Sequence, residues 1–312
     1  MPVHPQAQAF LDQAAGAPPM HQMPVPAGRA AFDAMAALGG PPEPVAAIED
    51  RTIPGPAGPL PIRIYRPATD ARLPVALWFH AGGFTVGSLA SHDPLCRTVA
   101  NRSGCAVIAV DYRLAPEHPF PAALDDAWAA LQWVAAHGAE LGVDSTRLAV
   151  CGDSVGGGLA AITSLLARDA RGPALRLQVM VYPDVDWRFT SPSWTTMSRD
   201  YFVTREVAEW LRGNYLPDPA QWTDWRASPL LAPSHAGLPP ALVICPEFTP
   251  IRSDVEAYVG KLRTSGVPVD YWLAAGMVMG FVSMAGVIDA GREALDRIGA
   301  ALGAALARST PH

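Results

Sequence analysis

Residues 147–158 read RLAVCGDSVGGG, an apolar run that leads through an aspartate and a serine into a glycine-rich segment. The run RLAVCG (147–152) predicts a strand and the glycine-rich segment predicts a helix, so Ser154 stands on a strand-to-helix turn with the pattern G-x-S-x-G. Gly152 and Gly156 suit this turn because a Cβ at either position would clash where the backbone doubles back. Such a turn holds a serine hydroxyl above the sheet, where it can act as a nucleophile.

Short apolar runs alternate with longer helical stretches on both sides of this turn. The alternation predicts an α/β fold with a mostly parallel central sheet flanked by helices on both faces. Helices are expected at 123–142 and 156–170, where the apolar residues have helical spacing. The expected strands are LPIRIY (60–65), VALWFH (75–80), AVIAVDY (106–112), RLAVCG (147–152), LQVMVY (177–182), ALVIC (241–245) and VDYWLAA (269–275).

Two regions interrupt the alternation. Residues 1–45 are rich in Ala, Pro and Met, and residues 185–235 form a long insert between two expected strands. An aromatic insert beside the strand ends of an α/β sheet is typical of a substrate lid, so we expect 1–45 and 185–235 to form a helical cap. Residues 46–184 and 236–312 then form the catalytic domain. The alternative is that the insert is additional core.

The strand at 75–80 runs into the small residues of His80-Ala81-Gly82-Gly83-Phe84. Small residues after a strand allow successive backbone N–H groups to point into a site, as an oxyanion hole requires. We interpret His80 as a structural residue that holds this loop, rather than as a general base.

Composition limits the classes of function. The chain has 312 residues, of which 50% are hydrophobic, and a formal net charge of −6 with scattered basic residues. This balance argues against nucleic acid as a partner and favours small neutral ligands. The expected partner is a small-molecule ester or another hydrophobic ligand. The N-terminus lacks the features of a signal peptide, and no apolar run approaches the roughly 18 residues of a membrane span. We therefore expect a cytoplasmic protein that does not insert into membranes.

The cysteines and acidic residues give no sign of a bound metal or organic cofactor. Cys96, Cys105, Cys151 and Cys245 lack C-x-x-C spacing and are interpreted as buried free thiols, with a disulfide or metal as the alternatives. GDSVGGG is not followed by Lys-Ser/Thr, so it does not read as a phosphate-binding loop. The sequence is compatible with a homodimer formed through an edge strand, but does not show one.

Several motifs together resemble one family. They are HAGGF (80–84), DYRLAPEHPFPAALDD (111–126), GDSVGGG (152–158), YP (182–183), PEFTPIRSD (246–254) and GMVMGF (276–281). Over nearly its whole length the chain resembles the bacterial hormone-sensitive-lipase-type (family IV) carboxylesterases of the α/β-hydrolase superfamily. The resemblance implies an α/β-hydrolase fold with a helical cap, and hydrolysis of short- to medium-chain acyl esters.

Carried over by position, the resemblance implies Ser154 as the nucleophile. It also implies an oxyanion hole from the backbone N–H groups of Gly82, Gly83 and Val155, with Asp153 and the HAGGF residues around it. Two positions depart from the family's catalytic triad, because Thr249 stands where an aspartate is usual and Met279 where the histidine is usual. Ala81 and Val155 also differ from the usual Gly and Ala.

These departures lie on the catalytic loops, whereas the scaffold motifs are intact. A methionine cannot accept a proton, so Ser154 loses the base that would activate it. The pattern indicates an engineered or inactivated carboxylesterase with strongly reduced hydrolysis. Two alternatives stay open: a small-molecule-binding protein that uses the emptied site, and an enzyme redirected to non-hydrolytic, lyase-like chemistry.

Other ionisable residues are candidates for a replacement base. Glu247 and Asp254, which flank Thr249, are interpreted as structural. Asp184 and Asp186 follow the strand at 177–182, and ordinary loop capping is favoured over acid–base or metal chemistry. His118 is interpreted as a loop brace and His92 as a helix-start residue. His4 and His21 lie in the N-terminal segment and could reach over the site, but no spacing rule supports a catalytic role for them.

Overall fold

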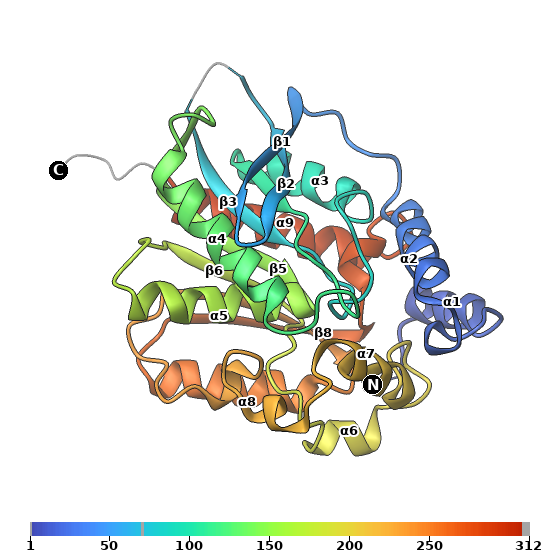
Figure 1. The fold of residues 1–312 in the computed structure, drawn as a ribbon. Coiled ribbons are helices and arrows are strands. Elements are labelled where there is room, and N and C mark those ends of the chain that lie inside the picture. The colour runs from blue at the N-terminus through green and yellow to red at the C-terminus, as the bar shows by residue number, and fades with distance from the viewer. Residues whose placement is uncertain (1, 70–71, 308–312) are drawn as a thin grey trace.

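The computed structural model describes residues 2–69 and 72–307, which fold around one eight-stranded sheet (Figure 1). The strand order is β1-β2-β4-β3-β5-β6-β7-β8. Neighbouring strands from β4 to β8 are parallel, and β2 is antiparallel to both β1 and β4. The strands are β1 (Ala47–Gly55), β2 (Gly58–Arg66), β3 (Leu73–Phe79), β4 (Ala106–Val110), β5 (Val143–Asp153), β6 (Leu177–Val181), β7 (Ala241–Phe248) and β8 (Val269–Val278).

The mostly parallel sheet expected from the sequence is confirmed, and each expected strand lies within or overlaps one of the observed strands. The sequence does not predict strand β1. Most of its residues are exposed and one of them is Pro54, so it lacks the apolar run that marks a buried strand. Among the described strands β1 pairs with β2 alone, in a hairpin whose turn includes Gly58 at a φ of +123°.

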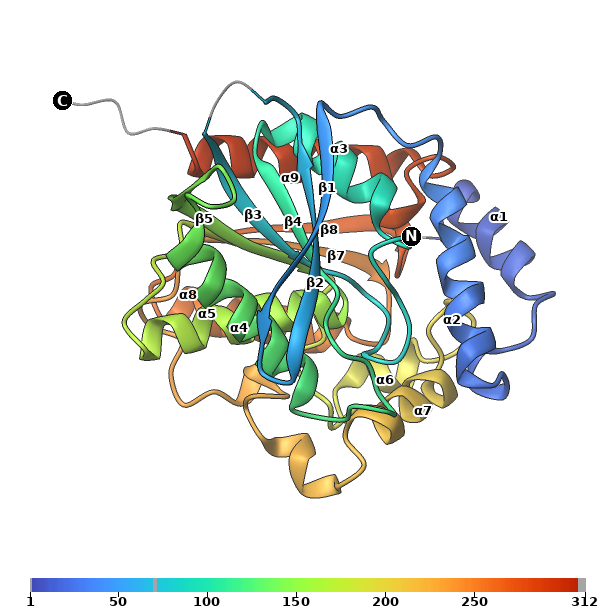
Figure 2. The ribbon, with the colours of Figure 1, turned by 45° about the horizontal axis from the view of Figure 1, so that its top comes forward.

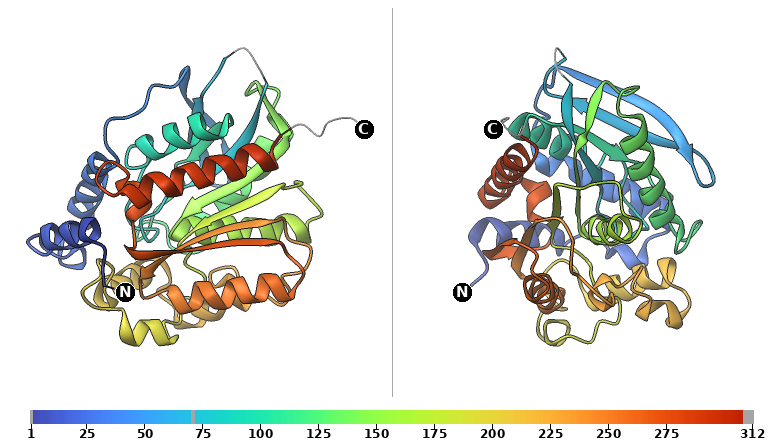
Figure 3. Two further views of the ribbon diagram at one scale, coloured as in Figure 1. Left: turned by 180° about the vertical axis from the view of Figure 1, so that it is seen from behind. Right: turned by 90° about the vertical axis from the view of Figure 1, so that its left-hand side faces the viewer.

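Helices cover both faces of the sheet (Figure 3). Helices α3 (Asp93–Ser103) and α9 (Asp289–Ala305) pack against each other on one face. Helices α4 (Ala122–His137), α5 (Val155–Asp169) and α8 (Arg252–Thr264) lie on the opposite face. The strands in the middle of the sheet are therefore buried on both sides, and all residues of β4 and β6 are buried.

The N-terminal helices and the insert lie together at one end of the sheet (Figure 2). The first group contains α1 (Pro5–Ala14) and α2 (Val25–Ala34), and the insert contains α6 (Pro192–Thr196) and α7 (Arg205–Tyr215). Phe10 of α1 and Phe202 of the insert meet edge to face, with ring centroids 5.0 Å apart. The short 3-10 helices are η1 (Met20–Gln22), η2 (Met35–Gly39), η3 (Pro219–Thr223), η4 (Pro229–Leu231) and η5 (Phe281–Met284).

Within the described residues, no helix has both the length and the apolar character that a membrane span requires.

Candidate active site

Ser154 lies on a sharp turn between β5 and α5, with a φ of +57° and ψ of −123°. This backbone conformation is unfavourable for a residue with a side chain. The turn is so tight that only glycine fits at two positions. A Cβ on Gly156 would overlap the carbonyl oxygen of Phe79, and a Cβ on Gly152 would overlap the backbone of Gly156. The glycines thus allow β5 and α5 to approach β3, and Ser154 keeps 9% of its surface exposed.

The hydroxyl of Ser154 is held by Asp184, which follows the neighbouring strand β6. Ser154 Oγ donates a hydrogen bond of 2.9 Å to Asp184 Oδ2. The backbone joins the same two residues, because the N–H of Asp184 donates to the carbonyl oxygen of Ser154 at 3.1 Å. The interpretation of Asp184 as an ordinary loop cap is therefore wrong, since its carboxylate contacts the predicted nucleophile.

Asp184 and Asp186 have different surroundings although they belong to one loop. Asp186 pairs with the guanidinium of Arg188 at 2.6 Å and accepts a hydrogen bond from the Arg188 N–H, as a loop cap does. In the part of the chain that the structure describes, no ion pair involves Asp184. Burial raises the pKa of Asp184 to about 7; the Ser154 hydrogen bond lowers it, and the charge of Asp254 raises it further.

The HAGGF loop follows β3 and has a backbone that only its glycines allow. Gly82 has a φ of +126° and Gly83 a φ of +59°. A Cβ on Gly82 would overlap the carbonyl oxygen of Val86, and one on Gly83 would overlap the side chain of Leu211 from α7. Among the described residues, none accepts a hydrogen bond from the N–H groups of Gly82, Gly83 or Val155. These donors remain available for an external acceptor.

His80 and Ala81 brace this loop from within. His80 is 2% exposed, stacks on Tyr112 with ring centroids 4.2 Å apart, and places Nδ1 2.7 Å from the carbonyl oxygen of Ala81. Burial lowers the pKa of His80 to about 3, so the imidazole is neutral at physiological pH. The N–H of Ala81 lies 3.2 Å from Nε2 of His92, which precedes α3.

Asp153 precedes the nucleophile but its carboxylate is turned into the interior. It is 1% exposed, and it accepts a hydrogen bond of 3.3 Å from Trp78 Nε1. Its other oxygen lies 3.2 Å from Nε2 of His92. Asp153 and His92 therefore connect the elbow to the HAGGF loop beneath the site.

Thr249 and Met279 lie side by side, with Thr249 Oγ1 3.7 Å from Met279 Sδ. They are 0% and 6% exposed. Ser154, Thr249 and Met279 follow the parallel strands β5, β7 and β8, so all three lie at the carboxyl edge of the sheet. The contact supplies neither a carboxylate nor an imidazole to this edge.

The acidic residues that flank Thr249 serve the scaffold. Glu247 accepts a hydrogen bond of 2.8 Å from the N–H of Gly276, the first residue of GMVMGF. Asp254 accepts one of 2.9 Å from Trp194 Nε1, which ties the insert to α8. Burial raises the pKa of Asp254 to about 6, and its hydrogen bonds, including the one from Trp194, act against this rise.

Aromatic rings cover the HAGGF loop on the side of the insert. Phe84 stacks on Tyr215 of α7 with ring centroids 3.8 Å apart, and Trp187 lies 6.1 Å from Phe84. Phe84 has a φ of +58°, which presents its ring to the insert. The HAGGF loop is therefore packed against buried aromatic side chains of the insert.

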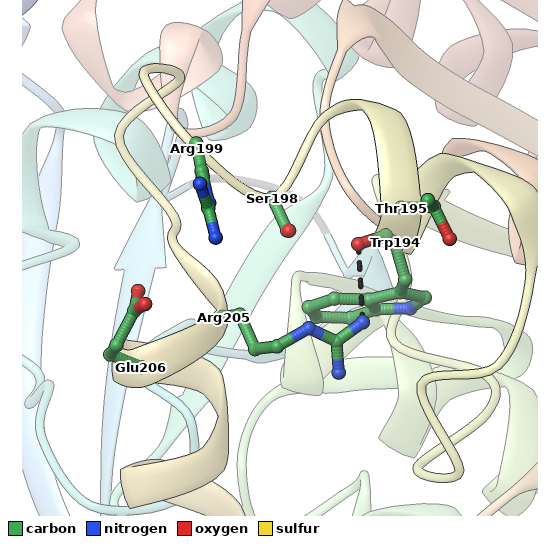
Figure 4. A pocket seen from close by; sticks show the side chains of 6 residues that line it. All are labelled: Trp194, Thr195, Ser198, Arg199, Arg205 and Glu206. Carbon is green, nitrogen blue, oxygen red and sulfur yellow. Dashed lines mark hydrogen bonds between the residues drawn. The ribbon is translucent and has the colours of Figure 1, made fainter.

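A separate hollow of about 330 Å³ lies within the insert (Figure 4). Arg205 crosses it and donates to the carbonyl oxygen of Trp194 at 3.1 Å, so this guanidinium already serves the insert. None of the predicted site residues lines the hollow, whose lining is Trp194, Thr195, Ser198, Arg199, Arg205 and Glu206.

No arrangement suited to a metal ion occurs among the described residues, because no three or more His, Cys, Asp or Glu side chains are grouped to hold one. The cysteines Cys96, Cys105, Cys151 and Cys245 are buried free thiols, as expected from their spacing.

Comparison with known proteins places this geometry in a family. Residues 76–283 match the model of a family with the α/β-hydrolase fold. The chain is 42% identical over 259 residues to esterase LipI of Mycobacterium tuberculosis, covering 80% of this chain and 79% of the relative. It is 38% identical to an ethyl acetate hydrolase of Pseudomonas putida, covering 89% of both chains.

A solved structure agrees with these relatives. The hyperthermophilic esterase from the archaeon Pyrobaculum calidifontis superposes with a TM-score of 0.93 at 39% identity, covering 98% of this chain and 100% of the other. These matches agree with the elbow at Ser154 and with the strand order of the sheet. The chain belongs to the carboxylesterase family of the α/β-hydrolase superfamily.

Proposed function

We propose that this chain is a slow carboxylic ester hydrolase that uses Ser154 as its nucleophile and lacks the histidine and the aspartate of the usual triad. The observation that supports it best is the elbow itself, which holds the Ser154 hydroxyl at the turn, while no described residue accepts a hydrogen bond from the N–H groups of Gly82, Gly83 and Val155. A nucleophile beside unoccupied backbone donors is what acyl transfer through a tetrahedral intermediate requires.

The reduced rate follows from Thr249 and Met279. Neither side chain accepts a proton at neutral pH, so the residue positions that would supply an imidazole and its carboxylate supply neither. Loss of the base of a triad lowers turnover by roughly 10⁴- to 10⁶-fold. An oxyanion hole and substrate binding alone still give a rate about 10³- to 10⁴-fold above that of the uncatalysed reaction in water. Hydrolysis persists at a low rate.

The substrate is a small hydrophobic ester with a short or medium acyl chain. In this proposal the N-terminal helices (1–45) and the insert (185–235) cover the site as a cap. The support is that Phe84 of the HAGGF loop packs on the aromatic rings of Tyr215 and Trp187 from the insert. Apolar surface of this kind favours the acyl and alcohol groups of neutral esters over charged substrates. A relative described as an ethyl acetate hydrolase supports the small size of the ester.

The test compares the hydrolysis of p-nitrophenyl butyrate by this chain, by Ser154→Ala and by the double variant Met279→His with Thr249→Asp. We expect slow turnover by this chain, background rates for Ser154→Ala, and a rate at least about 10²-fold higher for the double variant. The double variant rebuilds an acid–base pair at two side chains that are already in contact.

Equal rates for this chain and Ser154→Ala would contradict the proposal. If p-nitrophenyl butyrate then binds without turnover, the site belongs to a small-molecule-binding protein. An activity towards another substrate that survives Ser154→Ala would instead identify a redirected, non-hydrolytic enzyme.

A further inference from the structure

The hydroxyl of Ser154 makes a single side-chain hydrogen bond within the described chain, and its partner is the Asp184 carboxylate at 2.9 Å. A base that activates a nucleophile must lie within about 2.6–3.2 Å of the proton donor, and this distance falls within that range. The backbone hydrogen bond from Asp184 to Ser154 fixes the two residues relative to each other. The geometry required for proton transfer is already present.

We propose that Asp184 is a catalytic residue that acts as the general base for Ser154, in the absence of an imidazole at Met279. This inference rests on the proposed esterase function and adds to it the identity of the group that moves the proton.

In the acylation step, Ser154 Oγ attacks the ester carbonyl carbon and its proton passes to Asp184 Oδ2. The carbonyl oxygen becomes an oxyanion next to the N–H groups of Gly82, Gly83 and Val155. When the intermediate collapses, the bond to the alcohol breaks and the alkoxide takes the proton from Asp184. The products of this step are a Ser154 acyl ester, a free alcohol and an ionised Asp184.

Deacylation repeats these transfers with water. Asp184 removes a proton from the water molecule that attacks the acyl carbon, and then returns it to Ser154 Oγ as the carboxylic acid leaves. The Asp184 residue as a whole is half-buried. Water is the co-reactant of deacylation, and neither step requires an oxidant or a metal.

The surroundings of Asp184 fit a base that works near neutral pH. A carboxylate with an ordinary pKa is a weak base towards a serine hydroxyl, whereas desolvation raises the pKa of Asp184 to about 7. The charged groups nearby are Asp254 on α8, which raises this pKa further, and the Asp186–Arg188 pair on the same loop. In the described residues no cation is paired with Asp184 to stabilise its ionised form.

A structural role for Asp184 predicts different behaviour from a catalytic one. If its carboxylate only braced the elbow, its loss would lower the thermal stability and would change the rate equally at every pH. If it is the base, its loss removes the rise of the rate with pH, and the fold survives because Asn can still accept the Ser154 hydrogen bond.

The experiment measures kcat/KM for p-nitrophenyl butyrate from pH 5 to pH 9, together with the melting temperature at each pH. It uses this chain, Asp184→Asn, and Asp186→Asn as the matched control from the same loop. We expect this chain to show a rate that rises with an apparent pKa near 7 and then levels off. Asp184→Asn lowers kcat/KM at pH 8 by about 10²- to 10⁴-fold and removes this rise.

Asp186→Asn removes the ion pair with Arg188 and leaves the shape of the pH profile unchanged. The proposal is overturned if folded Asp184→Asn keeps the rate and pH profile of this chain, or loses rate in parallel with melting temperature at all pH values. In either case the Ser154→Ala variant tests the esterase function separately. If Ser154→Ala is inactive, the proposed esterase function stands and only the role of Asp184 as the base is withdrawn.

Discussion

Thr249 Oγ1 lies 3.7 Å from Met279 Sδ, in a contact from which solvent is almost completely excluded. Both side chains are uncharged, so the contact carries no desolvation penalty for an ion. A carboxylate at 249 without an imidazole at 279 would be a buried charge without a partner. The two side chains are therefore physically consistent with each other.

The single substitution Thr249→Asp is expected to lower the stability at pH 8 by about 3–5 kcal/mol, because it buries an unpaired charge. Adding Met279→His should recover most of this loss, since the imidazole would lie next to the new carboxylate. Urea denaturation of the two single variants and the double variant gives the coupling free energy. Additive effects of the two substitutions would show that the side chains do not interact.

Asp184→Asn is expected to stabilise the protein at pH 8. The pKa of Asp184 in the folded state, about 7, exceeds the ordinary value of 3.8. The contribution of the protonated carboxyl group to the folding free energy is therefore fully present below pH 3.8 and is lost as the pH rises through 7. Above pH 7 the raised pKa corresponds to a loss of at most about 4 kcal/mol in the free energy of unfolding, which Asn does not suffer. Melting temperatures at pH 5 and pH 8 measure the effect, with Asp186→Asn as the control. A variant less stable than this chain at pH 8 would contradict the expectation.

Asp254→Asn is expected to lower the apparent pKa of the pH–rate profile. The charge of Asp254 raises the pKa of Asp184, and removing this charge favours the ionised base. The amide oxygen can still accept the hydrogen bond from Trp194 Nε1, so the link between the insert and α8 is retained. Kinetics from pH 5 to pH 9 provide the measurement, and an unchanged midpoint would show that the two carboxyl groups are not coupled.

Gly156→Ala is expected to destabilise the protein by about 1–3 kcal/mol or more, because the new Cβ would overlap the carbonyl oxygen of Phe79. Gly213 in α7 is the matched control, since no atom lies within 4 Å of a Cβ built there. Gly213→Ala should be stabilising by about 0.5–1 kcal/mol through its higher helix propensity. Denaturant midpoints compare the two variants, and equal effects would contradict the tight elbow.

The elbow and the parallel sheet were predictable because their signals are local. Glycines around Ser154 and apolar runs of strand length report directly on backbone geometry and burial. Strand β1 escaped prediction because its exposed residues carry no apolar run and its pairing depends on β2. Its position at the edge of the sheet is a tertiary property.

The role of Asp184 was not predictable from its spacing. The sequence shows only two acidic residues after a strand, and capping is the usual function of such residues. Which of them faces Ser154 depends on β6 lying next to β5 and on the direction of each side chain. Asp186 caps the loop, as the sequence predicts, whereas Asp184 hydrogen-bonds to the Ser154 hydroxyl.

The most direct test of the central claim is the site of covalent labelling by diethyl p-nitrophenyl phosphate, measured by intact-protein mass and peptide mapping. The reagent releases p-nitrophenol when a nucleophile attacks phosphorus. We predict one diethylphosphoryl group on Ser154, added more slowly than in the double variant Met279→His with Thr249→Asp and absent from Ser154→Ala. The claim that Ser154 is still a nucleophile would be contradicted if Ser154 of this chain stays unlabelled when the double variant has reacted completely.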